Sequence, residues 1–88
     1  MLFIVLGKYR KKPTKETVDK ATESFGQLTK EGVKFIASYW TLGKYDTVAI
    51  VEAKDEKTIM KNLILFGDVQ STETLVAVLR EDAIKLVE

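Results

Sequence analysis

A short glycine-containing link between two strand-like runs constrains the fold of this chain more than any other feature. Residues 33–41 and 46–53 are both rich in aromatic and β-branched side chains, which favour strands. Four residues separate them, and Gly43 among these can adopt the positive φ that a tight turn needs. The two runs are therefore predicted to form an antiparallel hairpin.

Two helices are predicted from apolar side chains that recur every three or four residues. The first begins after the N-cap Thr14 and ends at Gly32, and the second begins after Asp55 and ends at Gly67. The apolar face of the first helix consists of Val18, Ala21, Phe25 and Leu28. The buried stripe of the second consists of Ile59, Met60, Leu63 and Ile64. A short terminal helix is predicted over residues 81–87.

The complete order of elements is predicted to be β-α-β-β-α-β. Residues 1–10 contain an apolar run that indicates the first strand, and residues 69–79 form the fourth. This is the split βαβ order of ferredoxin-like folds, in which both helices cover one face of a four-stranded antiparallel sheet. With 88 residues, of which 45% are hydrophobic and 31% charged, the chain is expected to be one α+β domain over residues 1–88.

Both faces of three predicted strands are apolar. In the first strand Leu2, Ile4 and Leu6 point one way, while Phe3 and Val5 point the other. Two helices can cover one face, and a small domain does not leave a second apolar face in water. We therefore expect a homodimer, or a higher even oligomer, whose sheets stack into a dimeric α+β barrel. The alternative is a terminal helix that folds back over the open face.

The composition argues against several classes of function. The chain has no histidine and no cysteine, so disulfides, thiolate chemistry and a zinc site are not expected, and the usual general base is missing. No phosphate-loop, dinucleotide or metal-ligand motif occurs, so we expect no cofactor and no metal.

A net charge of +1 gives no reason to expect nucleic acid or a membrane as partner. No run approaches the roughly 20 apolar residues that span a bilayer, so we expect a cytoplasmic protein. Abundant Lys and Glu with one Asn and two Gln are typical of a thermophile.

Side chains with chemical potential concentrate beside the hairpin turn. Tyr39, Trp40, Tyr45 and Asp46 are the candidate ligand-binding residues, and Asp46 is also the candidate catalytic residue, as a lone acid or base. An aspartate next to a turn more commonly accepts backbone hydrogen bonds, and we favour that role. Trp40 is either a lid over a ligand or an interface anchor, and we favour the anchor. Glu52 lies on the same strand roughly 20 Å from Asp46, so the two carboxylates cannot act as a pair.

The register of the hairpin decides which of these side chains share a face. A two-residue turn at Gly43 and Lys44 pairs Tyr39 with Val48. Tyr39, Asp46 and Glu52 then share one face, while Trp40, Tyr45 and Thr47 share the other. A one-residue bulge would exchange these assignments after the turn.

Two segments resemble motifs of the GYD domain family. Residues 43–46 contain the Gly, Tyr and Asp after which the family is named, and residues 67–75 resemble its Gly-Asn-Val-Arg-Thr-Glu-Thr-Leu pattern. The second segment departs from that pattern with Asp68 for Asn, Gln70 for Arg and one inserted residue near Ser71. The resemblance implies a dimeric α+β barrel and little about activity, because the family is largely uncharacterised. Loss of the arginine argues against an anion-binding role at Gln70.

Three functions are compatible with the sequence. We favour a small oligomeric module that binds a small organic ligand or effector between sheet and helices or at the dimer interface. The alternative is a cofactor-independent enzyme, similar to the monooxygenases and isomerases among related barrels, in which Asp46 transfers a proton and Tyr45 orients the substrate. The absence of histidine and cysteine weighs against an enzyme. A purely structural dimerisation unit is the third possibility.

Overall fold

A computed structural model describes residues 1–87 and has the predicted order of elements. The strands are β1 (Leu2–Tyr9), β2 (Lys34–Trp40), β3 (Thr47–Glu52) and β4 (Gln70–Ala77). The helices are α1 (Lys15–Lys30), α2 (Glu56–Leu65) and the short α3 (Arg80–Ile84), which continues into a 3₁₀ turn, η1 (Lys85–Val87). The predicted α+β fold is confirmed, and each strand is slightly shorter than its sequence pattern indicated.

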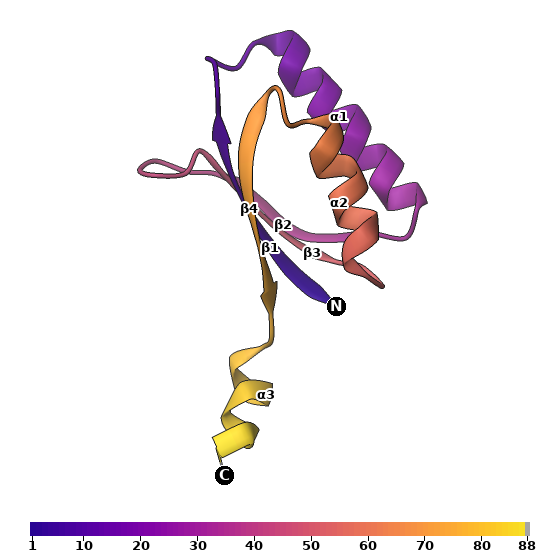
Figure 1. Cartoon of the computed structure of the whole chain (residues 1–88), viewed down its shortest axis with the longest axis vertical. Helices are drawn as coiled ribbons and strands as arrows, with labels where there is room; N and C mark the ends of the chain where they lie inside the picture. The colour runs from indigo at the N-terminus through magenta and orange to yellow at the C-terminus, as the bar shows by residue number, and fades with distance from the viewer. Residues whose placement is uncertain (88) are drawn as a thin grey trace.

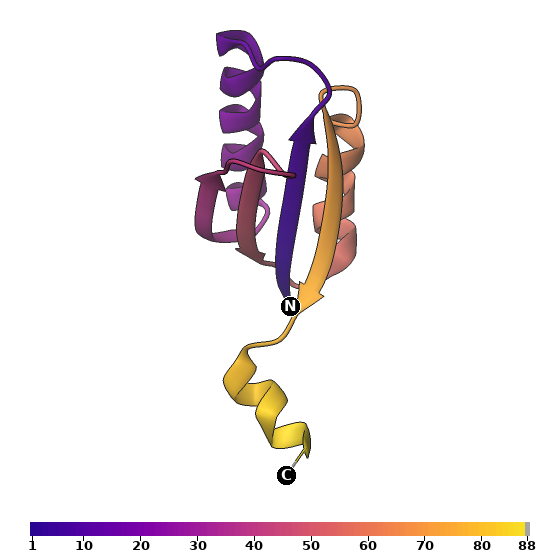
Figure 2. The same cartoon turned by 90° about the vertical axis from the view of Figure 1, so that its left-hand side faces the viewer.

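The four strands form one antiparallel sheet in the order β2-β3-β1-β4. β1 is central, with Phe3 opposite Val51 of β3 and Val76 of β4. Helices α1 and α2 both lie on one face of the sheet (Figure 1). A view turned by 90° shows α1 beside β2 and β3, and α2 beside β4 (Figure 2). This is the arrangement that right-handed crossovers impose on the split βαβ order.

Both predicted helix starts carry the expected caps. The Thr14 hydroxyl accepts a hydrogen bond from the Thr17 N–H at 3.2 Å, and the Thr17 hydroxyl accepts one from the Thr14 N–H at 2.9 Å. The Asp55 carboxylate accepts one from the Thr58 N–H at 3.1 Å, and this bond is the main reason that the pKa of Asp55 is lowered. These contacts satisfy backbone donors that the first turn of a helix leaves unpaired.

The hydrophobic core is small and lies between the sheet and the helices. Phe3 is completely buried, and its buried neighbours are Leu28, Val33, Val51, Ala53 and Ile59. In α2, Ile59 and Leu63 pack on this core, but Met60 and Ile64 are 55% and 71% exposed. The predicted stripe of α2 is therefore half wrong. Consecutive residues lie about 100° apart around a helix, so Met60 and Ile64, each one position after a residue that packs on the core, turn towards solvent.

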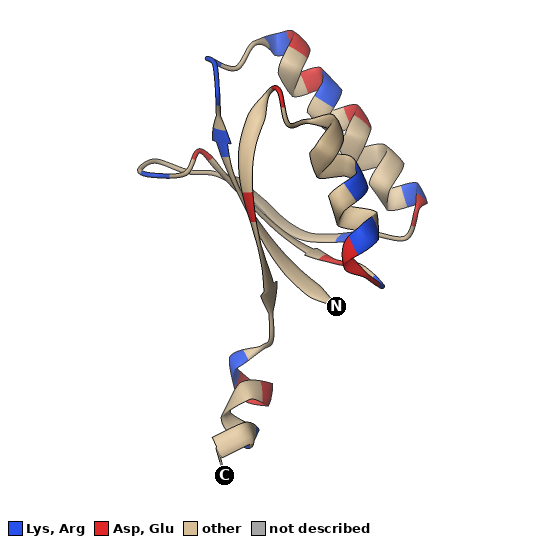
Figure 3. Ribbon diagram, viewed as in Figure 1, with Lys and Arg blue, Asp and Glu red and all other residues tan. Residues whose placement is uncertain are grey.

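The face of the sheet opposite the helices is mostly apolar, and we call it the open face. Its apolar members are Leu2, Ile4, Leu6, Ala37, Tyr39, Val48, Ile50, Leu75 and Ala77. Charged residues lie mainly at strand ends and along helices, with one acidic residue in the middle of β4 (Figure 3). Helix α3 and η1 extend away from the sheet, so the alternative of a terminal helix folded over this face is wrong (Figures 1 and 2). None of the helices in residues 1–87 combines the length and the hydrophobicity that a membrane span requires.

A β-bulge interrupts the pairing of β2 with β3. Phe35 pairs with Val51 and Ala37 pairs with Ile50, which leaves Ile36 as the extra residue. The bulge lies far from the turn, so the register near the turn is as predicted. Tyr39 is opposite Val48, and Trp40 is opposite Thr47. The prediction that Tyr39 and Trp40 lie on opposite faces is confirmed.

Candidate functional site

A partly enclosed cavity of about 160 Å³ lies between the sheet and helices α1 and α2. Most of its wall is apolar, and its apolar lining includes Val5, Phe25, Phe35, Val51, Leu63 and Phe66. Four of its lining residues are exposed to solvent, namely Thr22, Phe25, Ser38 and Trp40. All four belong to α1 or to the edge strand β2, so the cavity opens between these two elements.

Polar groups gather in the cavity where β1 carries Gly7. A Cβ added at Gly7 would lie 2.3 Å from Thr47 Oγ1 and 3.2 Å from Gln70 Nε2. Because glycine leaves this space free, the Gln70 amide of β4 reaches across β1 and donates a hydrogen bond to Thr47 Oγ1 of β3 at 3.4 Å. Two strands that are not neighbours in the sheet thus meet through their side chains, which we call the Thr47–Gln70 pair.

Two aromatic residues border the cavity close to this pair. The rings of Tyr9 and Trp40 are 5.9 Å apart at an interplanar angle of 67°, an edge-to-face contact. Burial, and to a smaller extent the nearby Asp46 carboxylate, raise the pKa of the Tyr9 phenol above 10.0. Tyr9 is therefore a neutral hydrogen-bond donor at physiological pH, and Trp40, 66% exposed, lies at the opening.

Asp46 fastens the base of the hairpin to β1. Its N–H donates to the Gly7 carbonyl at 2.8 Å, and its Oδ2 accepts from the Tyr9 N–H at 2.8 Å. Its carbonyl accepts from the Thr41 N–H at 2.8 Å. The carboxylate thus serves as an acceptor for the backbone, the role that the sequence favoured, and Asp46 is not among the residues that line the cavity.

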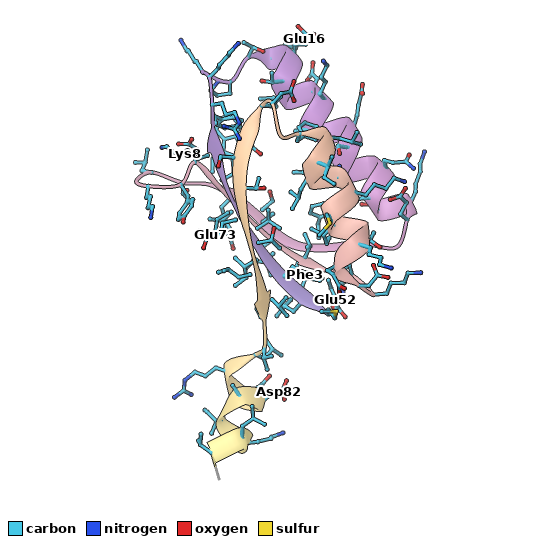
Figure 4. The ribbon with its side chains drawn as sticks, viewed as in Figure 1. Phe3, Lys8, Glu16, Glu52, Glu73 and Asp82 are labelled. Atoms are coloured by element: carbon cyan, nitrogen blue, oxygen red, sulfur yellow. The ribbon has the colours of Figure 1, made fainter. Side chains whose placement is uncertain are left out.

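The structure separates the four candidate residues. Trp40 lines the cavity and Asp46 is hydrogen-bonded to the lining residue Tyr9, whereas Tyr39 belongs to the open face. Tyr45 donates a hydrogen bond from its hydroxyl to Glu73 Oε2 at 2.6 Å, and Glu73 points away from the helices (Figure 4). The prediction that Tyr45 shares a face with Trp40 is wrong. Tyr45 precedes β3, so the alternation of a strand does not fix its direction.

Comparison with known proteins establishes the family. The sequence profile named GYD domain matches residues 3–87. The chain belongs to the GYD domain family. The resemblance noted from residues 43–46 and 67–75 is thereby confirmed. A search among curated proteins found no match to this chain.

Several solved structures share the fold of this GYD domain. One is 5-chloro-2-hydroxyhydroquinone dehydrochlorinase from Burkholderia phenoliruptrix AC1100 in complex with 2,5-dihydroxybenzoquinone, with 17% identity, a TM-score of 0.63, and coverage of 93% of this chain and 98% of that chain. A protein from Arabidopsis thaliana has 10% identity, a TM-score of 0.58, and coverage of 89% and 97%. A hypothetical protein from Pyrococcus horikoshii has 20% identity, a TM-score of 0.54, and coverage of 91% and 93%. At these low identities, the structural similarity establishes a common fold and nothing further.

Sequence reasoning missed most residues of the cavity in this GYD domain. Gly7, Tyr9, Thr47 and Gln70 were not singled out as a group. Gly7 did offer a signal, because a glycine inside an apolar strand marks a bulge or a close approach of other groups. The partners that make the approach come from two other strands, and their register is not visible in the sequence.

The lining of the cavity is uncharged. Among the described residues around it there is no aspartate, glutamate, lysine or arginine. Residues 1–87 contain no group of three or more histidine, cysteine, aspartate or glutamate residues suited to holding a metal ion. The basic residues on either side of Tyr9 are engaged elsewhere, since Lys8 Nζ donates to the Lys44 carbonyl at 3.3 Å and Arg10 Nε donates to the Gly67 carbonyl at 2.8 Å.

Proposed function

We propose that this GYD domain binds a small organic molecule, about the size of one aromatic ring, in the cavity between sheet and helices. The cavity volume of about 160 Å³ carries the proposal. An engineered apolar cavity of roughly 150 Å³ in another protein takes up benzene. Apolar walls supply binding free energy of roughly 25 cal/mol per Å² of ligand surface removed from water, and a few polar groups fix the orientation of the ligand.

The groups around the cavity favour binding over catalysis. A general base must reach the proton that it removes and must have a pKa near the working pH. Tyr9 is the titratable residue of the lining, and its raised pKa keeps it protonated at neutral pH. Asp46 holds the Tyr9 N–H with its carboxylate and does not line the cavity. A dehydrochlorinase of the same fold was crystallised with 2,5-dihydroxybenzoquinone, which makes single-ring compounds reasonable probes.

A titration with phenol tests the proposal. Trp40 is the single tryptophan of the chain and lies at the opening, so its indole N–H gives one assignable signal in a ¹H–¹⁵N spectrum. We expect a saturable shift of this signal. Ala49→Leu, which adds three carbon atoms to the wall of the cavity, should abolish the shift, and Ala83→Leu on the distant α3 should preserve it. An unchanged titration in Ala49→Leu would overturn binding at this place.

We also propose that the protein is a homodimer that buries its open face. The face is mostly apolar and no other part of residues 1–87 covers it. Tyr39 and Leu75 on it are 56% and 42% exposed, a state that stacking against a second sheet would relieve. One self-complementary patch suffices for a two-fold dimer. Light scattering at micromolar concentration should give twice the chain mass, and the mass of a single chain would contradict the proposal.

A further inference from the structure

We infer that the ligand is an uncharged single-ring compound whose amide, carbonyl or hydroxyl substituent is bound by the Thr47–Gln70 pair, and that the cavity discriminates against carboxylates. The inference rests on the proposed binding function. To that function it adds the charge of the ligand and the residues that recognise it.

The uncharged lining is the first argument. Transfer of a charge from water into an apolar site is unfavourable unless an opposite charge or several hydrogen bonds compensate it. Arginine and lysine are the side chains that most strongly bind carboxylates, and neither lines this cavity in the described chain. Lys8 and Arg10, the basic residues on either side of Tyr9 in the sequence, donate to backbone carbonyls outside the cavity.

The position of Asp46 adds to this discrimination. Its Oδ2 accepts a hydrogen bond from the Tyr9 N–H at 2.8 Å, so the carboxylate lies next to a residue that lines the cavity. Its negative charge already acts on the Tyr9 phenol, where it disfavours a second negative charge. The same charge disfavours an anionic ligand in contact with Tyr9. A neutral ligand does not incur this repulsion.

The Thr47–Gln70 pair supplies the hydrogen bonds that a neutral substituent needs. A glutamine amide has two N–H donors and one carbonyl acceptor, and a threonine hydroxyl can donate and accept. Within residues 1–87 their side chains make one hydrogen bond, the 3.4 Å contact between them. Their remaining donors and acceptors match an amide or a phenol, which also carries both kinds of group. A carboxylate offers acceptors alone.

Two probes of the same planar shape, one neutral and one anionic, test the inference. Dissociation constants for benzamide and benzoate are measured by ¹H–¹⁵N titration of the full chain at neutral pH. We expect benzamide to bind more tightly by about tenfold or more. Benzoate binding as tightly as benzamide would overturn the inference while leaving the proposed function intact. Failure of phenol, benzamide and benzoate alike to bind would overturn the proposed function itself.

Substitutions in the pair locate the recognition. Gln70→Arg introduces a cation and should reverse the preference, so that benzoate binds more tightly than benzamide. Thr47→Val keeps the shape of the side chain but removes the hydroxyl, and should weaken benzamide by about tenfold. The matched control is Thr74→Val on the same face of the sheet, outside the lining. If Thr47→Val and Thr74→Val bind benzamide equally well and unfold at similar denaturant concentrations, the pair does not recognise the ligand.

Discussion

Tyr45 and Glu73 form a contact between the hairpin and β4 whose strength depends on pH. The Tyr45 hydroxyl donates to Glu73 Oε2 at 2.6 Å, and this hydrogen bond is the main reason that the pKa of Tyr45 lies above 10.0. A group whose pKa is raised on folding contributes stability that is complete below its unfolded pKa. That contribution is lost as the pH rises through the folded pKa. The contact therefore persists at neutral pH and is released in alkaline solution.

The alkaline titration of the tyrosines tests this contact at the residue scale. Glu73→Gln removes the charged acceptor, so the pKa of Tyr45 should fall towards 10.0 while the pKa of Tyr9 remains raised by its burial. The measurement is ultraviolet absorbance of tyrosinate against pH, with Tyr45→Phe identifying the step that belongs to Tyr45. Superimposable curves for Glu73→Gln and the natural chain would rule out the hydrogen bond in solution.

At the scale of the elements, a glycine is required in the hairpin turn but not in α1. Gly43 in the hairpin turn has φ +113°, a conformation that residues with a side chain rarely adopt. Gly26 lies inside α1, and a Cβ added there would meet no other atom within 4 Å. The same change to alanine should therefore have opposite effects on the stability of the two elements.

Denaturant unfolding of the two alanine variants measures these effects. Gly26→Ala should raise the free energy of unfolding by about 0.5–1 kcal/mol, because alanine favours the helix and restricts the unfolded chain. Gly43→Ala should lower it by about 1 kcal/mol, because the positive φ is strained for alanine. Each variant is the control of the other at equal protein concentration. Changes of the same sign in both would contradict the assignment of these backbone conformations.

The elements themselves were largely predictable, and the site was not. Apolar periodicity and the caps Thr14 and Asp55 are local signals, and the structure has the corresponding helices. The exposure of Met60 was not predictable, because the rotation of α2 on the sheet depends on packing. The candidate site was placed at the hairpin turn, where reactive side chains are adjacent in sequence. The cavity instead depends on Gly7 and on side chains from β3 and β4, which meet through a register that no local pattern encodes.

At the scale of the whole molecule, the proposed dimer is expected to form through the open face. Ile4 of β1 and Ile50 of β3 are opposite each other near its centre. A glutamate in place of Ile4 would place a charge inside an interface between stacked sheets. We expect Ile4→Glu to be a monomer with a lower unfolding temperature, because a dimer is stabilised by its own concentration.

Light scattering and thermal unfolding at several protein concentrations check this expectation. The control is Ile64→Glu, which places the same charge on α2 at a side chain that is 71% exposed. That variant should retain the mass of the natural protein. A dimeric Ile4→Glu protein whose unfolding temperature still rises with concentration would show that the chains associate through another surface.

The irregular pairing at Ile36 bears on how the protein avoids aggregation. A regular unpaired strand edge can recruit strands from other molecules, which is how amyloid-like fibrils begin. β2 is an edge strand of the sheet, and it borders the opening of the cavity. The bulge bends β2 and interrupts the regular row of N–H and C=O groups that an incoming strand would need. The bulge thus makes this uncovered edge a poorer template for fibril growth.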